Sequence, residues 1–125
     1  MTSTNLYERL GGERGIASLV DDIVESHMQN PRIRARFLPY REDPDHLEVV
    51  KGHLRDFLAA GSGGPVEYRG RSMPEAHRGM NISEAEYMAA IDDILGVLDR
   101  HGIDAQTRQE VLGIAYSLKG EIMHV

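Results

Sequence analysis

At 125 residues the chain is long enough for a single domain over residues 1–125, and its net charge of −6 argues against nucleic-acid or anionic-membrane partners, which attract basic patches. It has no cysteine, which excludes disulfides and thiolate metal sites, while 41% of its residues are hydrophobic, enough for a modest core. Because no apolar run reaches the ~18–20 residues that span a bilayer and no signal peptide is apparent, we expect a cytoplasmic protein.

The first half of the chain has the period of amphipathic helices. Between residues 13 and 29, apolar side chains recur every three or four positions, and Pro31 ends this helix. A short turn-like piece over residues 32–37 follows. Asp43 has the character of an N-cap and begins a second helix, whose apolar face runs to Gly61.

A loop and a short helix interrupt the long helices in the middle of the chain. Three glycines and a proline between residues 61 and 65 disfavour both helix and strand, so we predict a loop there. The Ser72-Met-Pro-Glu75 sequence is a capping box, which begins a short helix that carries His77 and ends near Gly79. A helical bundle without a ligand seldom contains such a segment. Loops and short helices between long helices often cover a ligand pocket.

Two further long helices follow this segment. Ser83-Glu-Ala-Glu86 is a second capping box and opens a helix that ends near Gly102. Asp104 caps the last helix, whose apolar face continues to Ile122. Since no alternating apolar and polar run is long enough for a strand, we predict an all-α fold.

Six histidines are the candidates for metal chemistry: His27, His46, His53, His77, His101 and His124. His46, His101 and His124 lie at helix ends or near the C-terminus, where we expect solvated side chains. His53 lies at the edge of the apolar face of its helix and can lean toward the core.

His77 shares one helical face with Met73, four residues before it, and Met80, three residues after it. Spacing alone leaves two interpretations open, a metal ligand or an ordinary core histidine, and the second is the commoner case. Other metal chemistries find no support. A zinc hydrolase needs a His-Glu-x-x-His motif, which is absent, and Glu75 stands only two residues before His77, the wrong spacing for a di-iron bundle.

Several stretches resemble the truncated haemoglobins, and among them group I most closely. Leu6-Tyr7-Glu8-Arg9-Leu10-Gly11-Gly12 is similar to the opening of that family. Gly63-Gly64-Pro65-Val66-Glu67-Tyr68-Arg69-Gly70-Arg71-Ser72-Met73-Pro74-Glu75-Ala76-His77 is similar to its loop and proximal segment. The resemblance extends from about Leu6 to about Ile122.

This resemblance implies a truncated globin, a two-over-two sandwich of antiparallel helix pairs around haem b. It implies that His77 is the proximal iron ligand and that Phe37 stacks on the haem. Relatives that hold oxygen tightly place a tyrosine and a glutamine where this chain has Val24 and Val50. His53 lies one turn beyond Val50, where some relatives use a histidine as the sixth, distal iron ligand. A covalent haem linkage is not expected, because residues 118–120 contain no histidine.

Haem is a flat apolar disc with two carboxylates, so its contacts divide into two kinds. Lys51, Tyr68 and Arg71 are expected near the propionates, since charged hydrogen bonds to carboxylates are strong. The remaining expected haem contacts are His53, the ligand His77 and seven apolar side chains, namely Phe37, Val50, Leu54, Phe57, Leu58, Met73 and Met80.

Two functional hypotheses follow. In the first, the chain is a haem protein that binds oxygen, nitric oxide and carbon monoxide, with an unidentified reductase that returns the iron to the ferrous state. This hypothesis includes a nitric oxide dioxygenase, a redox haem protein or a peroxidase-like side activity as variants. In the second, the chain is a helical interaction module without a cofactor, and its histidines are incidental.

Overall fold

The computed structural model describes residues 5–124, which fold into helices and connecting turns with one isolated β-bridge, between Ile82 and Met123. The all-α prediction is therefore confirmed. The helices in chain order are α1 (Leu6–Arg9), α2 (Gly12–Gln29), α3 (Arg34–Phe37), the 3₁₀ helix η1 (Leu38–Glu42), α4 (Pro44–Gly61), α5 (Met73–His77), α6 (Glu84–Arg100) and α7 (Ala105–Ile122).

Local side-chain chemistry fixes where four of these helices begin. The side chains of Asp43 and Asp104 accept hydrogen bonds from backbone N–H groups in the first turns of α4 and α7. Ser72 and Ser83 form complete capping boxes with Glu75 and Glu86 at the starts of α5 and α6. All four helix starts agree with the sequence prediction.

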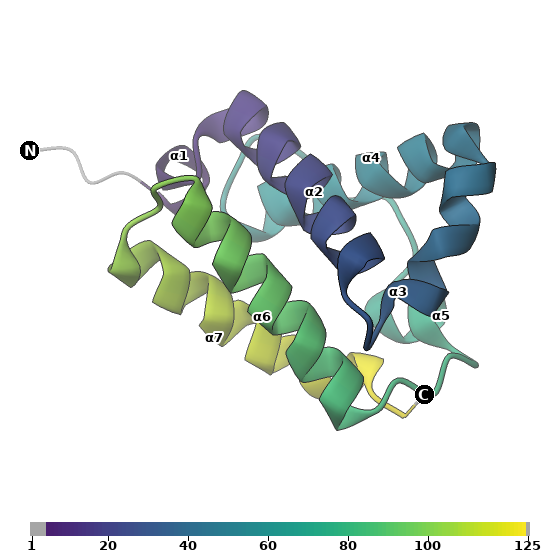
Figure 1. Ribbon diagram of the computed structural model, residues 1–125. Helices are drawn as coiled ribbons and strands as arrows, with labels where there is room; N and C mark the ends of the chain where they lie inside the picture. The colour runs from purple at the N-terminus through teal and green to yellow at the C-terminus, as the bar shows by residue number, and fades with distance from the viewer. Residues whose placement is uncertain (1–4, 125) are drawn as a thin grey trace, which may run out of the picture.

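The long helices form two antiparallel pairs (Figure 1). Helix α2 packs against α4, and α6 packs against α7, with α2 also in contact with α6 across the two layers. The short α5 packs on α7. The arrangement is the two-over-two sandwich that the resemblance implied.

The core is divided into two clusters of buried apolar side chains. The first lies between α2, α4 and α6 and includes Leu19, Val24 and Val97. The second lies between α6 and α7 and consists of Ile82, Tyr87, Ile91 and Ile122. Among the described residues, Leu95 of α6 is the one partly buried side chain that packs against both clusters.

The loop after α4 is bound tightly to the start of the chain. The backbone N–H of Tyr7 donates to the carbonyl oxygen of Ser62 (2.9 Å), and the Asn5 amide donates to that of Gly63 (3.1 Å). A Cβ atom at Gly64 would lie 2.5 Å from the Tyr7 ring, so this position accepts glycine alone. The loop is thereby fixed against α1. Within residues 5–124, no helix is both long and apolar enough to cross a membrane.

Candidate functional site

His77 stands at the end of α5 with one ring nitrogen already engaged. Its Nδ1 lies 2.9 Å from the carbonyl oxygen of Met73, one turn earlier in the same helix. A carbonyl oxygen only accepts hydrogen bonds, so Nδ1 carries a proton, and in the neutral imidazole Nε2 is then the nitrogen with the lone pair. A half-buried neutral imidazole with its Nδ1–H held by a backbone carbonyl is the usual form of a metal-binding histidine.

The methionines that flank His77 belong to the second core cluster. Met73 and Met80 are both partly buried and pack against its four buried members. The backbone N–H of Met80 donates to the carbonyl oxygen of His77 (3.1 Å), which closes a turn directly after α5. The two methionines that flank His77 in sequence therefore anchor this segment to the apolar second cluster.

Helix α4 carries several of the apolar residues that are expected to contact haem. Leu54 and Leu58 pack against the first cluster, and Val50 is half-buried. Val24 of α2, the other position at which the resemblance implies an apolar substitution, is almost fully buried at 2% exposure. His53 is exposed on α4.

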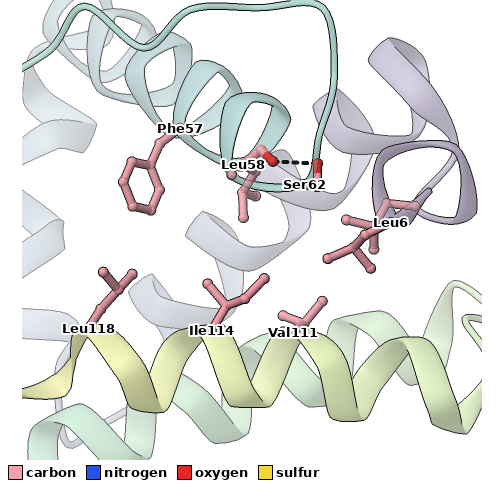
Figure 2. Close-up of a pocket in the computed structure, with 9 residues that line it drawn as sticks. Leu6, Phe57, Leu58, Ser62, Val111, Ile114 and Leu118 are labelled. Atoms are coloured by element: carbon pink, nitrogen blue, oxygen red, sulfur yellow. Dashed lines mark hydrogen bonds between the residues drawn. The ribbon is translucent and has the colours of Figure 1, made fainter.

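An apolar cavity of about 210 Å³ separates the end of α4 from α7. Figure 2 shows Phe57 and Leu58 of α4 on one side and Leu118 and Ile114 of α7 on the other. The hydroxyl of Ser62 donates to the Leu58 carbonyl oxygen (2.6 Å), so it offers no free donor to the cavity. The cavity therefore fits an apolar group of a ligand. Its lining is Leu6, Leu10, Phe57, Leu58, Gly61, Ser62, Val111, Ile114 and Leu118.

Phe37, at the end of α3, is partly buried beside a histidine that the sequence interpretation did not assign. Its ring centroid lies 5.0 Å from that of His27, which is 7% exposed. The Nδ1 of His27 lies 2.8 Å from Oδ2 of Asp93 on α6. Burial lowers the pKa of His27, although the Asp93 carboxylate acts in the opposite direction. Its position three residues after Val24, on the buried face of α2, is the signal that could have identified it.

The residues expected near the propionates do not all gather in one place. The hydroxyl of Tyr68 donates to the Arg71 carbonyl oxygen (2.7 Å), and the Tyr68 ring lies edge-on to Phe57 with centroids 5.2 Å apart. Arg71 is exposed beside this tyrosine. Lys51, in contrast, turns toward α2, because its ammonium pairs with Asp21 at 3.2 Å. The structure therefore brings Tyr68 and Arg71 together and gives Lys51 another partner.

The remaining histidines lie outside this region. His46 and His124 are exposed, as expected from their positions near helix ends. His101 is not simply solvated, because its Nε2 lies 2.6 Å from Oδ2 of Asp22 on α2. In residues 5–124 no group of three or more His, Cys, Asp or Glu side chains could hold a metal ion. A metal that is part of a prosthetic group brings most of its ligands with it and needs no such cluster.

Haem is a group of that kind, and the residues present fit it. It needs one axial imidazole with a free nitrogen, which His77 offers, and apolar walls on both faces. Partly buried apolar side chains from α4 and from the region of α5 and α7 would provide these walls, although His77 itself does not line the cavity between α4 and α7.

Comparisons with known proteins identify the family of this chain. The family model for bacterial-like globins matches residues 5–124. The group 1 truncated hemoglobin of Tetrahymena pyriformis is 31% identical over 119 residues, which cover 86% of this chain and 94% of that protein.

Solved structures of similar proteins share the fold. The Fe(III) form of truncated hemoglobin from Tetrahymena pyriformis superposes with a TM-score of 0.88 at 24% identity, over 98% of this chain and all (100%) of that one. The 2/2 hemoglobin from Synechococcus, solved in the cyanomet state with covalently attached heme, gives 0.84 at 21% identity over 96% and 98% of the two chains. The chain belongs to the bacterial-like globins and, within them, is similar to the group 1 truncated hemoglobins.

Proposed function

We propose that this globin holds haem b through His77 and binds oxygen and other diatomic gases reversibly on the side facing α4. The iron of the haem supplies the atom at which a diatomic gas binds. The hydrogen bond from Nδ1 of His77 to the Met73 carbonyl oxygen carries this proposal, because it leaves Nε2 as the one ring nitrogen free to bind iron.

The chain's own side chains would hold the rest of the group. Phe57, Leu58 and Met73 would contact its apolar faces, and the Arg71 guanidinium and the Tyr68 hydroxyl would meet its carboxylates. No histidine follows Ala115 in α7, which supports a haem held without a covalent bond to the protein.

On the side of the haem where a gas would bind, this chain has apolar side chains at two positions where the resemblance implies polar ones in relatives that hold oxygen tightly. Val24 and Val50 have no hydrogen-bond donor in their side chains, so they exclude water without fixing a polar ligand. Oxidation of nitric oxide would require such a polar partner, and reversible gas binding requires none. We therefore favour gas binding, with a reductase that keeps the iron ferrous.

His53 is the candidate for the sixth iron site. It lies on α4 one residue before Leu54, which packs on the first core cluster, and its imidazole is exposed. A neutral imidazole binds iron where geometry allows. A rotation of this side chain or a small shift of α4 would be needed to bring it to the metal.

Absorbance spectra of the purified protein test the proposal. We expect a red protein with a strong band at the blue–violet edge, and a shifted band when carbon monoxide is added to the ferrous form. A colourless protein that takes up no added haemin would refute it and would favour a helical interaction module.

A further inference from the structure

Arg36 joins the segment that carries Phe37 to the turn that follows His77. Its Nε and Nη2 donate to the two carboxylate oxygens of Glu86, with Nη2 at 3.1 Å from Oε1. Nη2 also donates to the carbonyl oxygen of Met80 at 3.0 Å. Arg36 immediately precedes Phe37, and Met80 closes the turn after His77.

This contact is better organised than an ordinary surface ion pair. The side chains of Arg36 and Glu86 are 28% and 24% exposed, whereas those of Arg41 and Glu25 in a nearby pair are 49% and 52% exposed. Fork-shaped arginine–carboxylate pairs of low exposure are the ones that contribute measurably. The carboxylate of Glu86 also accepts from the Ser83 N–H at 3.2 Å, which fixes it at the start of α6.

The charge state of the pair supports the same view. The Arg36 guanidinium lowers the pKa of Glu86 to about 2, so the carboxylate stays ionised at any neutral or mildly acidic pH. Helix α3 packs against α2 and η1. Through its hydrogen bond to the Met80 carbonyl oxygen, Arg36 also links α3 directly to the turn that follows His77.

We infer that Arg36 is a positioning residue that closes one edge of the haem crevice and slows the loss of bound haem. It does so by tying the Phe37 segment both to the turn after His77 and to the start of α6. The inference rests on the proposed function, because it assumes that His77 and Phe37 contact the haem.

The test is the rate at which haem leaves the holoprotein for an excess of a colourless haem-binding apoprotein, followed by absorbance. Arg36→Gln removes the charge and the fork, so we expect haem loss about three- to tenfold faster than in the wild type, the usual weight of one ordinary hydrogen bond. Arg36→Lys keeps the charge without the fork and should lie between the two. Glu86→Gln, which keeps an N3 side chain able to cap α6, should also speed haem loss.

Arg9→Gln is the matched control. Arg9 pairs with Glu110 and donates to the Thr107 hydroxyl at 3.2 Å, and its side chain is similarly exposed, at 26%. It joins α1 to α7 and contacts neither Met80 nor Glu86, so its loss should lower the free energy of unfolding and leave haem loss unchanged. Equal haem loss in Arg36→Gln and wild type, or equal acceleration in Arg9→Gln, would overturn the inference. Failure of the wild type to take up haemin would instead refute the proposed function on which it rests.

Discussion

The Nδ1 atom of His27 lies 2.8 Å from Oδ2 of Asp93, an interaction that joins α2 to α6 inside the protein. An ionised carboxylate only accepts, so the imidazole donates, and the Asn30 amide donates to the same carboxylate at 3.1 and 3.2 Å. The ring of Phe37 lies against this imidazole. A buried polar group therefore supports the aromatic ring that we expect to stack on the haem.

The first prediction concerns pH. Because burial lowers the pKa of His27 below its ordinary value of 6.5, the unfolded chain takes up a proton before the folded one. The free energy of unfolding should therefore fall as pH drops from above about 6.5 through the folded-state pKa. In His27→Gln this fall should be shallower, as measured by urea denaturation of the haem-free protein at several pH values. A slope equal to that of the wild type would mean that other groups control it.

The second prediction concerns the iron ligand. His77→Ala should abolish or greatly weaken haem binding, because it removes the imidazole whose Nδ1 is bonded to Met73. Added imidazole should partly restore the wild-type spectrum. His46→Ala, which removes an exposed imidazole near the start of α4, serves as the control and should bind haemin normally. A wild-type spectrum of His77→Ala in every redox state would exclude His77 as the ligand.

The third prediction concerns Phe37. Phe37→Ala should destabilise the holoprotein by about 3–5 kcal/mol, the range for deleting a buried aromatic ring. The haem-free protein should lose less, because the ring is only partly buried there. Thermal unfolding of both forms measures the difference. Equal losses would identify Phe37 as an ordinary core residue.

The fourth prediction concerns His53. If its imidazole occupies the sixth iron site, the ferric wild type should be low-spin, and a gas must compete with it, which slows binding. His53→Leu should then give a high-spin ferric spectrum and faster carbon monoxide binding by stopped-flow absorbance. A wild type that is already high-spin, and unchanged in the variant, would assign His53 no role at the iron.

Helix starts were predictable because their signals are local. The two capping boxes and the caps at Asp43 and Asp104 depend on residues at most three positions apart. Helices α1 and η1 span a single turn or little more, too short for a hydrophobic period to be detected.

The polar contacts around the site were not predictable in the same way. The partners of His27 and Arg36 lie 66 and 50 residues further along the chain, so only packing brings them together. The pairing of Lys51 with Asp21 likewise depends on how α2 meets α4. Family resemblance pointed to His77 and Phe37, but not to the side chains that hold them.

The divided core bears on how cooperatively the protein folds. The cluster nearest His77 has four buried residues, against ten in the cluster around α2. Fewer buried side chains give a smaller hydrophobic contribution, so without haem the half of the molecule that contains α5 should open first. A ligand that binds only the closed form stabilises it by mass action. Haem binding and the closing of the half that contains α5 are then one coupled equilibrium, and the bound group contributes apolar surface to the core.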